Sequence, residues 1–103
     1  MAAKEIFRMT PKTAGKGTTW KHSEHVAWRK VAGEAVILDV DTAVYYSLNG
    51  VGLRIWELLG ERKPEAEILD AITSEYDAPR QRIAEDLERL LRRLKKEGII
   101  APA

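Results

Sequence analysis

The change of hydrophobic period along the chain limits its possible folds more than any other feature. The first half contains three short runs rich in β-branched and aromatic residues and separated by turn residues, at 26–31, 35–40 and 44–48. Such runs predict an antiparallel meander. Apolar residues then recur every three or four positions, which predicts helices over about 50–59, over 64–76 and from 79 to the glycine at 98. The order predicts an α+β fold, a three-stranded antiparallel sheet followed by three helices, similar to a winged helix-turn-helix.

A chain of 103 residues is long enough for one domain and too short for two. Residues 1–22 are rich in Lys, Thr and Gly and show no period, so we expect a flexible basic tail followed by a folded domain over 23–103. No apolar run reaches the roughly 18 residues that a transmembrane helix needs. The N-terminus also lacks the apolar segment of a secretory signal. The expected location is the cytoplasm, without a membrane partner.

The charge pattern leaves two interpretations of the third helix. The whole chain has a net charge of +1, but this helix contains seven basic and four acidic side chains. A basic helix in a winged-helix fold is typical of a small DNA-binding regulator. However, DNA-binding domains are usually basic throughout, and the chain beyond residue 24 is slightly acidic. Pairs such as Asp86 and Arg89 have the spacing of ion pairs within a solvated helix. A nucleic-acid partner is therefore the less favoured alternative.

Few residues have the chemistry of a catalytic or metal site. The absence of cysteine excludes disulfides, thiolate metal sites and cysteine nucleophiles. The serines and histidines show no triad context, and the His22-x-x-His25 spacing lacks a nearby third ligand, which favours two exposed histidines. Asp39 and Asp41 flank a predicted hairpin turn, where aspartate hydrogen-bonds the backbone. We predict a protein that is not an enzyme and has no catalytic residue, metal or cofactor.

The third β-rich run, Val44–Leu48, is predicted to be an edge strand. It contains neither lysine nor proline, the residues that often block an open edge, and its tyrosines offer contact area. An extended peptide can add here as a further strand, with Tyr46 expected to donate to it. A mixed-sign stripe on the third helix, formed by Arg82, Asp86, Arg89 and Arg93, suits a peptide better than a phosphate backbone. The alternatives are an edge covered by the tail and an edge that pairs with a second copy in a homodimer.

The residues that join this strand to the first helix resemble the strand-to-helix signature of PqqD-like proteins. The matching residues are Tyr45-Tyr46-Ser47-Leu48-Asn49, Gly52 and Ile55-Trp56-Glu57-Leu58-Leu59. Ile68, Tyr76-Asp77, Asp86-Leu87, Leu90-Leu91 and Gly98-Ile99-Ile100 follow in the order of that family. The resemblance covers about residues 25–100 and implies a winged-helix-like fold of three strands and three helices.

The resemblance also implies a function. PqqD-like modules recognise precursors of ribosomally made, modified peptides, whose leader pairs with the third strand and lies against the third helix. By position, the implied peptide-binding residues are Val44, Tyr45, Tyr46, Ser47 and Leu48 on the strand and Arg82, Asp86, Arg89, Leu90 and Arg93 on the helix. The implied partners are a precursor peptide and a modifying enzyme, either a radical S-adenosylmethionine enzyme or a leader protease. Pyrroloquinoline quinone biosynthesis is one of several pathways that fit.

Overall fold

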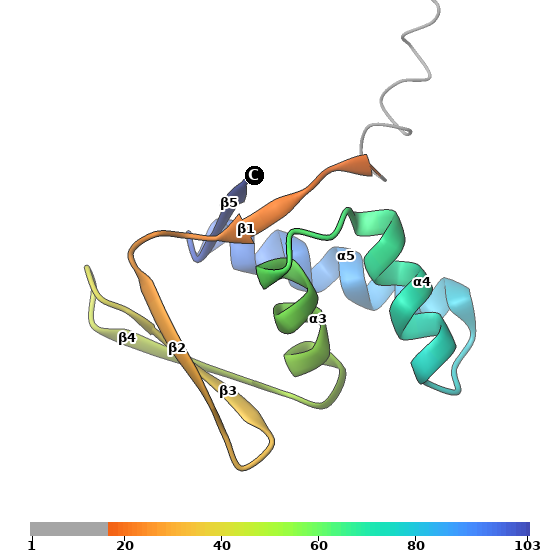
Figure 1. The fold of residues 1–103 in the computed structure, drawn as a ribbon, viewed down its shortest axis with the longest axis horizontal. Coiled ribbons are helices and arrows are strands. Elements are labelled where there is room, and N and C mark those ends of the chain that lie inside the picture. Colours follow the sequence, from red (N-terminus) through yellow and green to blue (C-terminus); the bar gives the residue numbers. More distant parts are fainter. Residues whose placement is uncertain (1–16) are drawn as a thin grey trace, which may run out of the picture.

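The computed structural model describes residues 17–103, and residues 1–16 of the predicted tail lie outside the described part. The strands and helices follow the order β1 (Trp20–His22), β2 (Val26–Val31), β3 (Glu34–Asp39), β4 (Val44–Asn49), α3 (Gly50–Gly60), α4 (Glu65–Glu75), α5 (Arg80–Lys96) and β5 (Ile100–Pro102). Figure 1 shows the sheet of β2, β3 and β4 to one side of the three helices. None of the helices between residues 17 and 103 is long and apolar enough to cross a membrane.

The three-stranded sheet confirms the predicted α+β architecture. Its order is β2-β3-β4, and both neighbouring pairs are antiparallel. Ala32 and Gly33 join β2 to β3 with positive φ angles of 51° and 81°, the conformation of a type I′ turn. At the other hairpin Asp39 accepts hydrogen bonds from the amides of Asp41 and Thr42 at 2.9 and 3.2 Å, which confirms the predicted turn.

A second, two-stranded sheet is absent from the sequence prediction. β1 pairs antiparallel with β5, so that Trp20 lies opposite Pro102. The Trp20 indole also donates a 2.7 Å hydrogen bond to Glu65 at the start of α4. The predicted tail boundary at residue 22 is therefore wrong for residues 20–22, which form a strand of the folded domain. A strand of three residues is too short to show a period, and its partner lies about 80 positions away in the sequence.

The hydrophobic core lies between the three-stranded sheet and the helices. Its fully buried members come from the central strand, from α3 and α4 and from the residue before β5, and the largest are Ile37, Ile55, Trp56, Leu59, Ile68, Ile72 and Ile99. α3 contacts β1, β3, β4 and α4, so it joins the two sheets to the helical layer. The apolar stripe of α5 faces this core with Ile83, Leu87, Leu91 and Leu94.

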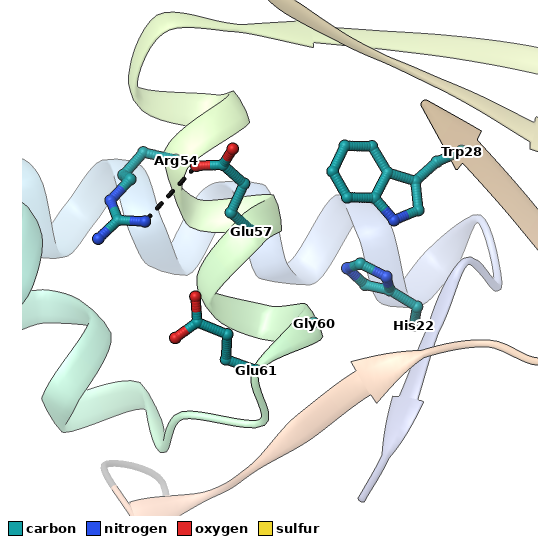
Figure 2. Close-up of a pocket in the computed structure, with 6 residues that line it drawn as sticks. All are labelled: His22, Trp28, Arg54, Glu57, Gly60 and Glu61. Carbon is teal, nitrogen blue, oxygen red and sulfur yellow. Dashed lines mark hydrogen bonds and ion pairs between the residues drawn. The ribbon is translucent and has the colours of Figure 1, made fainter. Parts of the chain in front are cut away.

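His22 is part of this packing, which corrects the expectation of an exposed histidine. Its ring stacks on Trp56 with centroids 3.7 Å apart, and its Nε2 lies 2.9 Å from the Trp56 carbonyl oxygen. Trp28 packs edge-on against both rings, and Figure 2 shows it beside His22. A Cβ at Gly60 would come within 2.8 Å of the imidazole, so the end of α3 has room only for glycine. Burial lowers the pKa of His22 below its ordinary value of 6.5, although the hydrogen bond to Trp56 opposes that shift.

We expect this histidine to make stability fall as the pH falls. Because the folded-state pKa lies below 6.5, the unfolded chain takes up the proton first, and this lowers its free energy relative to the folded chain. The free energy of unfolding should therefore decrease from about pH 6.5 downward. His22→Phe keeps a ring on Trp56 but removes the titration, so urea unfolding should show a weaker loss for this variant. Other groups titrate in both proteins and cancel in the comparison, and equal pH profiles would contradict the assignment to His22.

Candidate functional site

β4 is an edge strand, as predicted. Among the strands of residues 17–103 it pairs with β3 alone, which leaves its other side without a main-chain partner. The strand is also well exposed, with Val44 at 44% and Tyr45 at 67% of full exposure. An extended chain that brings its own amide and carbonyl groups can satisfy such an edge.

The hairpin between β2 and β3 fixes the hydrogen-bond register of the whole sheet. In a two-residue type I′ hairpin the residues that flank the turn, here Val31 and Glu34, form a hydrogen-bonded pair. Bonded and non-bonded pairs alternate along antiparallel strands. The 2.9 Å bond from the Val40 amide to the His25 carbonyl, at the far end of the hairpin, agrees with this alternation. Even-numbered residues of β3 therefore bond to β2, and odd-numbered residues bond to β4.

This register identifies the free backbone groups of β4. Ile37 bonds to β4, and its partner is Tyr46, so the amide and carbonyl of Tyr46 are used inside the sheet. The backbone groups of Tyr45 and Ser47 point to the open side instead. The expectation that Tyr46 donates to an added strand is therefore wrong. The outward backbone groups belong to its neighbours Tyr45 and Ser47, because the register depends on the turn type and not on the hydrophobic pattern of β4.

A groove lies beside this strand, between the start of α3, the loop before α5 and α5 itself. Its volume is about 450 Å³, and it is lined by Val51, Gly52, Ile55, Tyr76, Asp77, Ala78, Pro79, Arg82, Ile83, Asp86 and Leu90. Leu48 at the end of β4 connects the strand to the groove, since its Cδ2 lies 3.5 Å from where a Cβ on Gly52 would be. The groove has an apolar floor, with one arginine, Arg82, and two aspartates, Asp77 and Asp86, in its lining.

The predicted helix residues divide into two groups. Arg82, Asp86 and Leu90 line the groove. Arg89 lies outside the lining but holds Asp86 with a 2.8 Å hydrogen bond, while Arg82 Nε lies 3.7 Å from the same carboxylate. These contacts confirm the predicted ion pairing along α5. A negative charge is thus fixed between two arginines at the rim of the groove.

Arg93 lies at the other end of α5, close to β4. The Tyr46 hydroxyl donates a 3.1 Å hydrogen bond to Glu97, just past the end of this helix. Partial burial and this bond raise the pKa of Tyr46, whereas the positive charge of Arg93 lowers it. Arg93 therefore places a positive charge near the Tyr46 side chain of β4.

The apolar lining of the groove was not identified from the sequence. In the sequence Val51, Ile55, Ile83 and Tyr76 stand at apolar positions of the helical periods, the same signal that marks the core. Nothing in a helical period tells which apolar residues face a neighbouring helix and which face a groove. Tyr76 is the partial exception, because a large aromatic residue at a helix end, 37% exposed here, is an unusual core residue.

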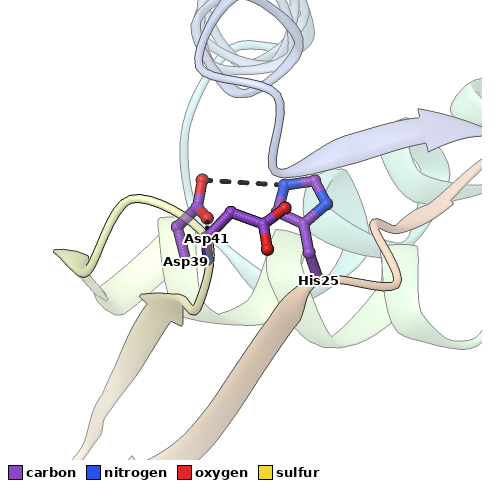
Figure 3. A group of neighbouring side chains, drawn as sticks. All are labelled: His25, Asp39 and Asp41. Carbon is purple, nitrogen blue, oxygen red and sulfur yellow. Dashed lines mark hydrogen bonds and ion pairs between the residues drawn. The ribbon is translucent and has the colours of Figure 1, made fainter.

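Outside the groove, one cluster has metal-ligand chemistry. His25, Asp39 and Asp41 bring a ligand atom each to within 4.8 Å of one another (Figure 3). His25 Nε2 lies 3.6 Å from Asp39 Oδ2, and the other oxygen of Asp39 accepts the turn amides. Asp39 is buried, and these contacts account for both of its oxygens. These contacts hold the start of β2 against the β3–β4 turn, which gives the cluster a structural role.

Comparisons with known proteins identify the family and the fold of this chain. The family model for coenzyme PQQ synthesis protein D (PqqD) matches residues 34–100. The structure of TbiB1 in complex with the TbiA(beta) leader peptide is 39% identical, with a TM-score of 0.74 over 78% of this chain and 93% of that chain. Lasso peptide synthetase B1 complexed with the leader peptide shares the fold, with 24% identity and a TM-score of 0.74 over 81% of this chain and 98% of that chain. No curated protein matches significantly by sequence.

Proposed function

Because this chain belongs to the PqqD family, we propose that it binds the leader of a ribosomally made precursor peptide and delivers that peptide to a modifying enzyme. The leader adds to the sheet as a further strand beside β4. The chain itself supplies no chemistry in this proposal. It acts in the cytoplasm as a peptide chaperone.

The open edge of β4 is the observation that supports this proposal most strongly. Tyr45 and Ser47 present amide and carbonyl groups that no residue of 17–103 bonds, and these groups match the spacing of an extended peptide. Main-chain hydrogen bonds of this kind give affinity without reading the sequence of the guest. The TbiB1 structure, at 39% identity, contains a leader peptide, which agrees with such a guest.

The groove beside β4 supplies selection among leaders. Alternate side chains of an added strand point toward the groove between α3 and α5. Its floor, formed by Ile55 of α3 and by Ile83 and Leu90 of α5, favours apolar residues. Arg93 adds a positive charge near the strand, which favours an acidic leader residue at that end. The proposed peptide-binding set is therefore Val44, Tyr45, Tyr46, Ser47, Leu48, Arg82, Asp86, Arg89, Leu90 and Arg93 together with the groove lining.

The second protein partner is the enzyme that modifies the bound precursor. A radical S-adenosylmethionine enzyme or a leader protease both fit a module that holds the leader and leaves the remainder of the peptide free. Holding the leader raises the effective concentration of the attached substrate segment at the enzyme. Pyrroloquinoline quinone biosynthesis and other pathways of peptide modification are equally compatible with this role.

The DNA-binding alternative is less well supported. Within residues 17–103, Arg80, Arg82, Arg89 and Arg92 of α5 each lie within ion-pair distance of a carboxylate. These carboxylates would repel the phosphates that a recognition helix must approach. The two functions also differ in their dependence on salt. Phosphate binding weakens steeply as salt rises, whereas strand addition to β4 should change little between about 50 and 200 mM salt.

The central test removes one outward amide from β4. We expect Ser47→Pro to abolish leader binding, because proline has no amide hydrogen to give to the added strand. Ser47→Ala is the matched control, since it loses the same 2.6 Å bond from the Ser47 hydroxyl to Glu34 but keeps the amide. The measurement is a calorimetric titration with the cognate leader peptide, with circular dichroism to verify the fold. Equal binding by folded Ser47→Pro and Ser47→Ala proteins would refute strand addition at this edge.

A second test compares two neighbouring arginines of α5. Arg93 lies near Tyr46 on β4, whereas Arg92 pairs with Glu88 at 3.4 Å on the side that faces β1. We expect Arg93→Glu to weaken leader binding by about five-fold, the size of one partly exposed charge contact. Arg92→Glu makes the same change in charge and should leave the affinity within two-fold, roughly the noise of such titrations. Equal losses in both variants would show a general charge effect and not a groove beside β4.

A further inference from the structure

The central strand β3 is apolar on both of its faces. Side chains of a strand alternate between faces, and a strand covered on one side normally alternates apolar and polar residues. Here Ala35 and Ile37 on the inner face are fully buried in the core. Val36 and Leu38, on the opposite face, are also apolar but only half-buried, and they are absent from the residues that pack against the core. Such a composition is typical of a strand that is covered on both sides.

The neighbouring strands extend this apolar surface. Ala27 and Tyr45 lie directly opposite Leu38 in β2 and β4, and Arg29 lies opposite Val36. Val31 continues the same face of β2 and is 50% exposed, while Tyr45 is 67% exposed. We call this surface the outer sheet face. It is formed by Ala27, Arg29, Val31, Val36, Leu38 and Tyr45, with Glu34 and Ser47 as its hydrogen-bonded polar members. The main contacts of β3 within residues 17–103 are with β2, β4 and α3, and α3 lies on the other side of the sheet, with the core.

We propose that the outer sheet face is the docking surface for the modifying enzyme, which reads it together with the bound leader. This inference rests on the proposed function. A leader paired with Tyr45 and Ser47 continues the sheet by one strand, so its alternate side chains extend the outer sheet face beyond β4. An enzyme that covers this combined surface contacts the chaperone and the leader at once. It therefore binds the loaded chaperone more tightly than the empty one.

The chemistry of the face defines the surface that fits it. The partner needs a flat apolar area opposite Leu38 and a carboxylate opposite Arg29, which forms no ion pair within residues 17–103. A second copy of the chain is the competing occupant, because Glu34 uses one carboxylate oxygen to accept from Ser47 and keeps the other for an Arg29 of another copy. The sedimentation measurement described below distinguishes the two occupants.

The test places a charge on the face without disturbing the leader edge. Ala27→Lys adds a charge at an exposed position opposite Leu38, on the strand farthest from β4. Ser74→Lys makes a similar change at an exposed site on α4 and serves as the matched control. The probes are the cognate leader peptide and the purified enzyme that modifies its precursor. Leader affinity is measured first, and the affinity of the enzyme for the leader-loaded protein is measured second.

We expect both variants to bind the leader within two-fold of the unaltered protein. Ala27→Lys should weaken enzyme binding at least ten-fold, and Ser74→Lys should not. Val36→Thr keeps a β-branched side chain in the strand and should weaken enzyme binding in the same direction, by a smaller factor. This variant tests the docking surface even if Ala27→Lys fails to fold.

Three results would overturn the proposal. Unchanged enzyme affinity in Ala27→Lys and Val36→Thr would exclude the outer sheet face as the docking surface. A dimer of the unaltered protein in sedimentation, dissociated by Ala27→Lys, would assign the face to a second copy. Failure of the unaltered protein to bind the leader in the first titration would refute the proposed function itself and the docking surface with it. The first of these results, obtained together with normal leader binding, would refute the docking surface alone and leave the proposed function standing.

Discussion

The packing around Trp56 joins the sheets to the helices. This side chain is fully buried in α3, the helix that follows the edge strand directly. Its ring stacks on His22 from β1 and meets Trp28 from β2, so two strands from different sheets contact the same residue. The position of α3 relative to β4 depends on this cluster. The groove between α3 and α5 has its shape for the same reason, because the start of α3 forms one of its walls.

The proposed binding site combines two physical principles that act at different positions. The backbone of β4 offers hydrogen bonds that any extended chain can make, while the groove and the charges of α5 discriminate among side chains. Separating affinity from selection lets closely related folds accept different leaders through changes on α5 alone. The strand itself needs only to stay at the edge and to keep its register with β3.

The sequence predicted the elements with a clear period and missed those that depend on long-range contacts. The strands of the meander, the helices and the edge position of Val44–Leu48 follow from local patterns and their order. β1 and β5 could not be found in this way, because three residues show no period and the two strands meet only in the folded chain. The donor residue on β4 was misassigned because the turn at Ala32 and Gly33, on another hairpin, sets the register. The groove lining was hidden among core residues, since apolar side chains on a helix look alike in sequence whichever neighbour they face.

The pairing of β1 with β5 has a consequence for how this module can be connected to other proteins. The amide of Ala103 bonds to the carbonyl of Thr19 at 3.0 Å, so the two ends of the folded part leave the domain side by side. Figure 1 shows this pair beside one end of α3, whereas β4 leads into the other end. A polypeptide inserted or fused at this point departs away from the guest strand. The same fold can therefore work as a separate protein or as a unit inside a longer enzyme without a change in its peptide-binding edge.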